Sequence, residues 1–162
     1  MRAYLGLGSN LGDRLGHLRQ AVESLGAIDA SLAVSPVYET APVGGPEQGP
    51  YLNCVVRLDT ELSPLELLDL AQRLESEAGR VRTVRNGPRT LDVDVLLIEG
   101  VQLQTAELTV PHPRMRERAF VLAPLEDLDG ALVPAGWRQH LGGASTVAGD
   151  IRRVGTIEEN SG

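Results

Sequence analysis

Lysine is missing from this chain, although it carries 15 basic residues among its 162. Every basic residue is therefore an arginine. A Walker-type phosphate loop and a Schiff-base enzyme both depend on a lysine, so both mechanisms are excluded. Any phosphate group that binds here must be held by arginine, by a metal ion or by backbone groups.

Aromatic residues and cysteine are also scarce, and the net charge is negative. The chain has one Trp, three Tyr, one Phe and one Cys, and its formal net charge at pH 7 is −7. Binding many phosphates needs a basic surface, and stacking many bases needs aromatic side chains, so we expect no nucleic-acid partner. The lone Cys54 cannot form an intramolecular disulfide, and its strand-like surroundings predict a small buried side chain without catalytic chemistry.

Long apolar runs are absent from the sequence as well. No segment approaches the roughly 20 apolar residues of a membrane-spanning helix, so we expect no membrane partner. The first residues, MRAYLGLGSN, lack an apolar run followed by a small-residue cleavage site, and we expect a cytoplasmic protein. The length fits one domain over residues 1–162, which we expect to act as a monomer.

The apolar periodicity predicts alternating strands and helices. Strands are expected at residues 3–7, 31–40, 51–60 and 91–100, and helices at 15–25 and 64–78. Residues 101–104 and 108–113 are expected to be extended, residues 114–128 to be helical at least in part, and the tail from about residue 142 to be loosely held. This order indicates an α+β fold with a ferredoxin-like core, in which a mostly antiparallel sheet forms part of an αβα sandwich.

Several short signals refine these boundaries. Ser63 and Glu66 have the spacing of a capping box and predict the start of the second helix. Pro36 predicts an edge or a bulge within its strand. The turn GSNLGD, which follows the first strand, is expected to be capped by Ser9 or Asn10.

Two aspartates stand at the start of the fourth strand, in GPRTLDVDVLLIEG (residues 87–100). Successive side chains of a strand point to opposite faces, so Asp92 and Asp94 project on the same face with Cα atoms roughly 6 to 7 Å apart. Their charges repel, and a divalent metal would reverse the sign of the local field. A solvated strand face is the alternative, because this pattern alone is weakly specific.

Arginines cluster on both sides of these aspartates. The upstream cluster is Arg80, Arg82, Arg85 and Arg89, and the downstream cluster is Arg114, Arg116 and Arg118. Guanidinium groups beside a metal site suit phosphoryl transfer, in which charge on phosphate oxygens is neutralised. Surface ion pairs to Glu75 and Glu77 are the alternative for the upstream cluster. His112, between two prolines, is either a turn histidine or a phosphate contact.

The segment GLGSNLG near the start suggests a different class of function. Glycines at this spacing after a strand are typical of a dinucleotide-binding turn, which would make the protein an oxidoreductase. That turn requires a parallel βαβ unit, which the following Pro36 and glycine-rich loop do not favour. A ferredoxin-like ligand-sensing or RNA-binding module is a third alternative, in which the two aspartates would be a solvated face.

Four segments together resemble one known family, the 6-hydroxymethyl-7,8-dihydropterin pyrophosphokinases of folate biosynthesis. The segments are GLGSNLGDR, YLNCVV, GRVR followed by GPRTLDVDVLL, and LTVPHPRMRERAFVLAPL. The similarity runs in order from about residue 3 to residue 137. The resemblance implies an enzyme that transfers diphosphate from ATP to the hydroxymethyl group of the pterin and releases AMP.

The resemblance also implies a role for individual residues. Asp92 and Asp94 match a pair that holds two Mg²⁺ ions, and Arg80 and Arg89 match arginines that aid catalysis. The residues that match ATP contacts are Gln72, Glu75, Arg82, His112 and Arg118. The residues that match the pterin pocket are Thr40, Pro42, Val43, Tyr51, Asn53 and Phe120, of which Tyr51 and Phe120 match its two aromatic walls.

Overall fold

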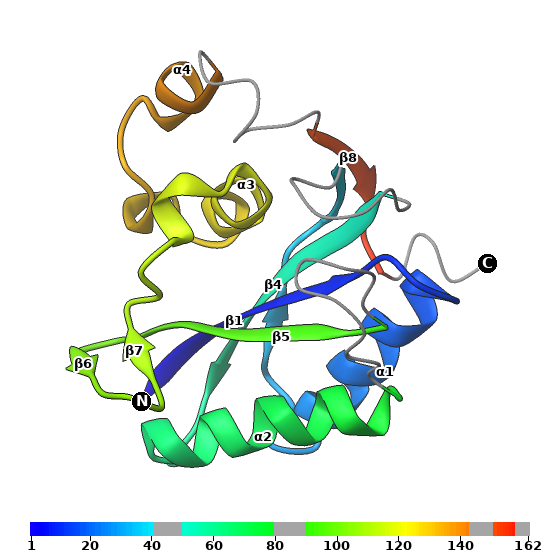
Figure 1. Ribbon diagram of the computed structural model, residues 1–162, viewed down its shortest axis with the longest axis vertical. Helices are drawn as coiled ribbons and strands as arrows, with labels where there is room; N and C mark the ends of the chain where they lie inside the picture. The colour runs from blue at the N-terminus through cyan, green and yellow to red at the C-terminus, as the bar shows by residue number, and fades with distance from the viewer. Residues whose placement is uncertain (41–49, 80–89, 143–150, 158–162) are drawn as a thin grey trace.

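The structure, a computed structural model, describes residues 1–40, 50–79, 90–142 and 151–157, without the side chains of residues 140–142. Its main element is a sheet of six strands (Figure 1). These strands are β1 (Arg2–Ser9), β2 (Ala33–Val34), β3 (Val37–Thr40), β4 (Tyr51–Asp59), β5 (Asp92–Ile98) and β8 (Ile151–Gly155). A small second sheet pairs β6 (Leu103–Gln104) with β7 (Thr109–Val110).

Four α-helices accompany these strands in the part of the chain that the structure describes. They are α1 (Arg14–Gly26), α2 (Pro64–Glu77), α3 (Ala119–Leu128) and α4 (Trp137–Gly142). Short 3₁₀ turns occur at Met115–Glu117 and Gly130–Leu132. None of the described helices combines the length and the apolar character that crossing a bilayer requires.

The strand order identifies the architecture. The strand order of the main sheet is β5-β1-β4-β3-β8. Strand β3 pairs with the first residues of β4, and β2 pairs with β4 further along, at Val56 and Arg57. All described pairings of the main sheet are antiparallel. The first four positions of that order reproduce the ferredoxin-like arrangement expected from the sequence, so the fold prediction is confirmed. The described sheet contains no adjacent parallel strands, which removes the βαβ unit that a dinucleotide-binding turn requires.

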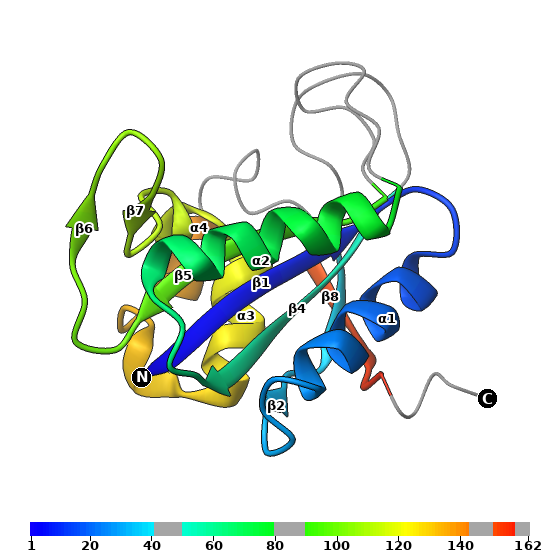
Figure 2. The ribbon, with the colours of Figure 1, turned by 90° about the horizontal axis from the view of Figure 1, so that it is seen from below.

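Helices cover both faces of the sheet. Figure 2 shows α1 and α2 on the near side of the sheet and α3 beyond it. Leu5, Leu7 and Val93 pack in the large core under α1 and α2, whereas Tyr4 and Val55 pack in a smaller core under α3. This alternation along each strand is the period-two pattern of a sheet buried on both faces.

The helix starts follow the local sequence. Ser63 caps α2, and its side chain and that of Glu66 form the predicted capping box. Asp13 caps α1, because its carboxylate accepts a hydrogen bond from Gly16 N at 3.0 Å.

Three further predictions concern strands. Pro36 separates β2 from β3, and the Ser35 hydroxyl accepts a hydrogen bond from Val55 N at 2.8 Å, so the predicted irregularity is present. The tail was expected to be loosely held from about residue 142, yet residues 151–155 form β8 against β3. Cys54 is buried in β4, and burial raises the pKa of its thiol to about 12. The thiol is therefore protonated at neutral pH, which agrees with the prediction that Cys54 has no catalytic chemistry.

Candidate functional site

Asp92 and Asp94 lie on the face of β5 that is turned toward α3. Both side chains are half-buried, whereas Val93 and Val95 between and after them are buried against α1 and α2. The prediction that the two carboxylates share a face is therefore confirmed. Since like charges at this spacing repel, the arrangement calls for a nearby cation.

Two glycines of β1 stand directly beside these aspartates. Gly8 pairs with Asp92, and Gly6 pairs with Asp94. Neither glycine has a side chain, so neighbouring side chains can lie directly over the backbone of β1 at these positions. A Cβ atom on Gly8 would lie 2.7 Å from Asn53 Oδ1, which is closer than such contacts allow. A side chain at position 8 would therefore displace Asn53 from its present position.

Asn53 connects the aspartates to a second group of predicted residues. It pairs with Gly8 on β1 and with Tyr38 on β3, so one row crosses the sheet from Asp92 to β3. Its side-chain Nδ2 donates to Thr40 Oγ1 at 2.9 Å, and Thr40 is paired with Tyr51. Asn53, Thr40 and Tyr51, all predicted to contact the pterin, thus form one cluster.

A third group lies where the chain enters α3. Arg118 Nη1 is 3.8 Å from Asp94 Oδ2, and the Arg118 guanidinium carbon is 5.5 Å from the centre of the Phe120 ring. Arg118 thereby contacts both a predicted metal ligand and a predicted aromatic wall.

His112 belongs to the same group. Its backbone N donates to Leu96 O at 2.6 Å, and its Nδ1 accepts a hydrogen bond from Arg114 N at 3.2 Å. Burial lowers the pKa of the imidazole, Asp94 acts in the opposite direction, and Arg118 and Arg114 lower the pKa further. The ring is therefore neutral at pH 7, and with Nδ1 accepting, its proton is on Nε2.

The two residues predicted on α2 have different surroundings. Gln72 is exposed, whereas Glu75 is buried and its Oε2 accepts a hydrogen bond from Val93 N at 2.9 Å. Val93 lies between the two aspartates on β5, which is an edge strand of the described sheet. Glu75 thus satisfies a backbone donor at that edge and ties α2 to the strand that carries the aspartates.

Three of the five aromatic residues are held by acidic side chains at the C-terminal part of α3. The hydrogen bonds join Tyr4 to Asp129 (3.5 Å), Tyr38 to Asp127 (2.5 Å) and Trp137 to Glu126 (2.9 Å). The other two aromatic residues, Tyr51 and Phe120, are those that the resemblance places in the pterin pocket.

The remaining predicted residues lie outside the part that the structure describes. They are Pro42, Val43, Arg80, Arg82 and Arg89. Along the chain, the three arginines fall between Gly79, after α2, and Thr90, two residues before Asp92.

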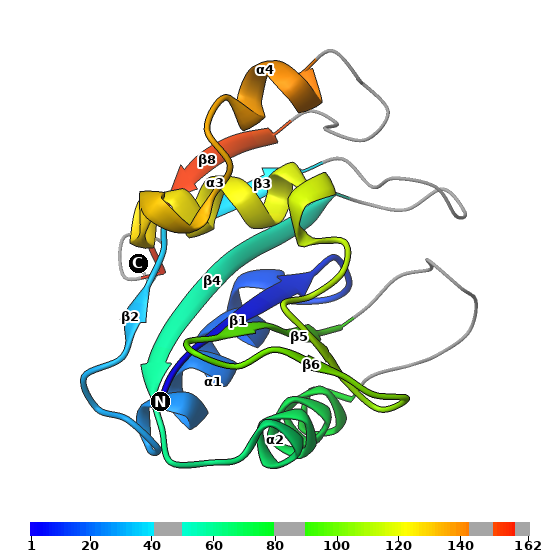
Figure 3. The same cartoon turned by 90° about the vertical axis from the view of Figure 1, so that its left-hand side faces the viewer.

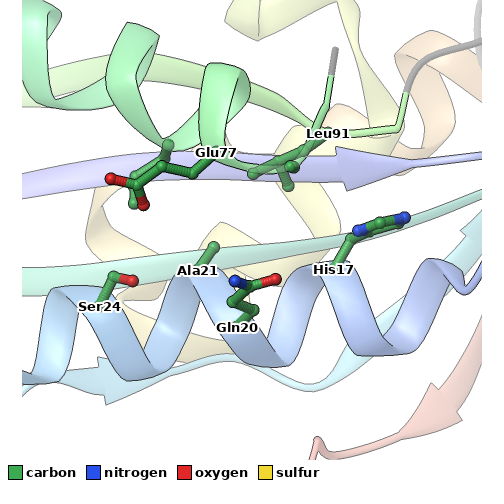
Figure 4. A pocket seen from close by; sticks show the side chains of 8 residues that line it. His17, Gln20, Ala21, Ser24, Glu77 and Leu91 are labelled. Carbon is green, nitrogen blue, oxygen red and sulfur yellow. The ribbon is translucent and has the colours of Figure 1, made fainter.

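A groove on the opposite face of the sheet contains none of the predicted residues. It lies between α1 and α2 and has a volume of about 190 Å³ (Figure 4). Its lining is His17, Gln20, Ala21, Ser24, Leu74, Glu77, Ala78 and Leu91. That volume includes space open to solvent, so the enclosed part of the groove is smaller still and lies below the roughly 300 Å³ at which ligand pockets begin. The predicted residues Asp92, Asp94 and Asn53 lie instead on the α3 face of the sheet.

Asp92 and Asp94 fit a magnesium site. Their carboxylates are oxygen donors on one strand face, and Asp94 already lies opposite a cationic group. Within the described residues, no group of three His, Cys, Asp or Glu side chains could hold a metal. Magnesium commonly binds through one or two carboxylates and completes its shell with water and substrate phosphates, so two aspartates suffice.

The sequence prediction did not identify Gly6 and Gly8 as part of the site. The signal was present, because these glycines have the same period of two as Asp92 and Asp94. Instead, they were considered only as part of a turn.

Comparisons with known proteins agree on one family. A profile of the family described as 7,8-dihydro-6-hydroxymethylpterin-pyrophosphokinase (HPPK) matches residues 4–130. The 2-amino-4-hydroxy-6-hydroxymethyldihydropteridine pyrophosphokinase of Bacillus subtilis (strain 168) is 52% identical over 128 residues, which are 78% of this chain and 77% of that protein. The enzyme of the same name from Pseudomonas aeruginosa is 46% identical over 129 residues, which are 78% of this chain and 80% of that protein.

Solved structures resemble the fold. A crystal structure of HPPK-DHPS in complex with substrates matches 88% of this chain with a TM-score of 0.57 and 12% sequence identity. A Plasmodium falciparum HPPK-DHPS structure matches 78% of this chain with a TM-score of 0.53 and 14% identity. This chain covers 43% and 40% of the length of those chains. At such identities the likeness concerns the fold alone.

Proposed function

This chain belongs to the 7,8-dihydro-6-hydroxymethylpterin-pyrophosphokinase family, and we propose that Asp92 and Asp94 hold the Mg²⁺ ions on which its reaction depends. The reaction is pyrophosphoryl transfer from ATP to 6-hydroxymethyl-7,8-dihydropterin in folate synthesis. The observation that supports this assignment is the row Asp92, Gly8 and Asn53, in which one glycine separates the proposed metal ligand from the proposed pterin contact.

In this proposal the pterin lies between Tyr51 and Phe120 and receives a hydrogen bond from Asn53. The bond between Asn53 and Thr40 supports this role, because it fixes the orientation of the buried amide. The polar edge of the pterin would then form hydrogen bonds with the oriented side chain of Asn53. Its hydroxymethyl group would point along the row toward Asp92.

The hydroxymethyl oxygen attacks the β-phosphorus of ATP. The new bond joins that oxygen to the β-phosphorus, the bond from the β-phosphorus to the α–β bridging oxygen breaks, AMP leaves, and the hydroxyl proton passes to water. Bound magnesium would neutralise phosphate charge and polarise the β-phosphoryl group. Asp92 and Asp94 would hold the ions at β5, next to Gly8 and Gly6 of β1.

Cationic and neutral donors of this chain would complete the phosphate site. Arg118 carries a permanent charge beside Asp94, and His112 offers a neutral Nε2–H donor. Arg80, Arg82 and Arg89 would supply further guanidinium groups, a role that rests on their sequence resemblance. No general base is assigned among the described side chains. We therefore propose that positioning of the substrates and neutralisation of phosphate charge accelerate the reaction.

An assay of nucleotide products tests this proposal. Purified protein is incubated with ATP, with and without the hydroxymethyl pterin and with and without Mg²⁺, and the nucleotides are separated by chromatography. We expect AMP only when all three components are present. Formation of ADP instead of AMP would overturn the pyrophosphoryl transfer, and full activity in excess chelator would overturn the metal requirement.

A further inference from the structure

Strand β8 covers the outer edge of β3, beside the predicted pterin contacts. Strands β8 and β3 lie side by side (Figure 3). In their register, Thr40 is paired with Ile151, and Glu39 is paired with Arg152. Residues 151–155 lie beyond residues 4–130, which the family profile matches. The strand that ends at Thr40 is therefore flanked by a segment outside the matched part of the chain.

Glu39 is bound by two arginines from different elements. Its Oε2 accepts from Arg14 Nη1 at 3.1 Å, and its Oε1 accepts from Arg152 Nη2 at 2.7 Å. The side chain of Glu39 is only 24% exposed. Burial opposes ionisation, but the hydrogen bonds from Arg14 and Arg152 outweigh it and hold the pKa of Glu39 below its usual value.

The same arginine also reaches β4. Arg14 Nη1 donates to the carbonyl oxygen of Pro50 at 2.9 Å, and Pro50 immediately precedes Tyr51. One guanidinium group at the start of α1 therefore holds the end of β3 and the start of β4. Arg152 adds β8 to this network, which we call the Glu39 clamp: Arg14, Glu39, Pro50 and Arg152.

The clamp lies one residue from the pterin contacts on both strands. Thr40 follows Glu39, and Tyr51 follows Pro50. Thr40 and Tyr51 are paired, and Thr40 also accepts the hydrogen bond from Asn53. Because neighbouring strand residues point to opposite faces, the clamp lies on the α1 side and the contacts on the α3 side. A change in the clamp would shift the backbone that carries these contacts.

We infer that the Glu39 clamp positions Thr40 and Tyr51 for the pterin, so that β8 contributes to substrate affinity without touching the substrate. The inference rests on the proposed function, since it requires that the cluster of Thr40, Tyr51 and Asn53 binds the pterin. Glu39, Arg14 and Arg152 are positioning residues in this scheme.

Three substitutions in this chain, Glu39→Ala, Glu39→Gln and Arg152→Ala, and one matched control test the clamp. Glu39→Ala removes the shared carboxylate, and Arg152→Ala removes only the contribution of β8. Arg138→Ala is the control, because Arg138 Nη2 donates to Glu126 Oε1 at 3.1 Å in a comparable exposed Arg–Glu pair. The readouts are the dissociation constant of the pterin from fluorescence titration, KM for each substrate, and the midpoint of thermal unfolding.

We expect the effect to be specific for the pterin. Glu39→Ala should weaken pterin binding by about tenfold, since it leaves two arginines unneutralised. Arg152→Ala should weaken it by about two- to fivefold, as an exposed pair allows, and Arg138→Ala should change it by less than about twofold. Glu39→Gln should fall between wild type and Glu39→Ala. KM for ATP should stay within about twofold of wild type in every variant.

Each contrary result has a clear meaning. Equal losses for ATP and pterin, or pterin binding in Glu39→Ala that matches wild type, would overturn the clamp. If Glu39→Ala shows no cooperative unfolding, Arg152→Ala decides by the same criteria. A wild-type protein that neither binds the pterin nor forms AMP refutes the proposed function instead. In that case the clamp is tested separately by amide hydrogen exchange at Thr40 and Tyr51. Exchange rates in Glu39→Ala that match those of wild type would refute the clamp.

Discussion

Arg118 and Asp94 face each other across the candidate site, with 3.8 Å between Nη1 of the arginine and Oδ2 of the aspartate. Since one carboxylate oxygen is directed at the arginine, a cation that binds Asp94 must compete with Arg118. Arg118 would then be available for a phosphate that arrives with the metal.

This competition predicts opposite effects of Arg118→Met on two ligands. In the absence of nucleotide, Mn²⁺ should bind about two- to fivefold more tightly than to wild type, which is the range that a partly exposed ion pair allows. KM for ATP should rise by about tenfold, because a charged donor to phosphate is lost. Electron paramagnetic resonance of free Mn²⁺ measures the first effect, and steady-state kinetics the second.

Arg116→Met is the control for this prediction, since Arg116 is exposed in the neighbouring 3₁₀ turn. It should leave both quantities close to those of wild type. Mn²⁺ affinity that is unchanged in Arg118→Met would show that the arginine does not compete for Asp94.

Asp94→Asn should remove activity while preserving the fold. The substitution keeps the size of the half-exposed side chain and relieves its repulsion with Asp92, so thermal stability should change little. Loss of metal-derived charge stabilisation, which is worth several kcal/mol, predicts a fall in turnover of at least about a hundredfold. AMP release at saturating Mg²⁺ and ATP measures this effect, and circular dichroism checks the fold. Turnover near that of wild type would exclude Asp94 as an essential metal ligand.

Gly8→Ala and Gly6→Ala form a matched pair on β1. A Cβ atom at position 8 would lie 2.7 Å from Asn53 Oδ1, whereas at position 6 its nearest contacts are with Leu96 at 3.5 Å. Gly8→Ala should therefore displace Asn53 from Thr40 and raise KM for the pterin by about tenfold, as expected when a buried hydrogen bond is broken. Gly6→Ala should alter KM for the pterin much less. The same pterin KM in both variants would contradict the role given to Gly8.

Glu75 should affect activity by holding β5, the strand that carries Asp92 and Asp94, in place. Glu75→Leu leaves Val93 N without its acceptor, which should destabilise the protein by about 1–3 kcal/mol and lower metal-dependent turnover. Glu75→Gln retains an acceptor oxygen, so its stability and its metal-dependent turnover should be close to those of wild type. Urea unfolding and AMP release measure the two quantities. If Glu75→Gln instead raises KM for ATP as much as Glu75→Leu does, the carboxylate contacts the nucleotide, as the sequence resemblance implies.

Local sequence patterns were sufficient for part of this site. The shared face of Asp92 and Asp94 follows from strand alternation, and the capping box of Ser63 and Glu66 follows from spacing within one turn. Both depend on residues a few positions apart. The ferredoxin-like core was equally accessible, because the order of strands and helices specifies it.

Contacts between distant segments were not predictable in the same way. The placement of Gly8 beside Asp92 and Asn53 depends on the register of three strands, and the bond from Val93 N to Glu75 depends on how α2 docks. Strand β8 was missed because its pairing with β3 joins residues more than 100 positions apart, and IRRVG has no clear alternation of its own.

The single tryptophan offers a pH-dependent test of the packing around α3. Trp137 Nε1 donates to Glu126 Oε2 at 2.9 Å, and Arg138 donates to the other carboxylate oxygen. The hydrogen bond from Trp137 lowers the pKa of Glu126 below the usual glutamate value of 4.5. Desolvation opposes this shift, and the hydrogen bond and charge of Arg138 add to it. Stability from this carboxylate is therefore present above pH 4.5 and is lost as the pH falls through the lower folded-state pKa.

Tryptophan fluorescence should change with a midpoint below pH 4.5, and this transition should be absent in Glu126→Gln, whose amide does not titrate. Arg138→Ala should raise the midpoint, because it removes one of the two groups that lower the pKa. A midpoint at or above 4.5, or a transition that persists in Glu126→Gln, would show that Glu126 does not hold the indole in solution.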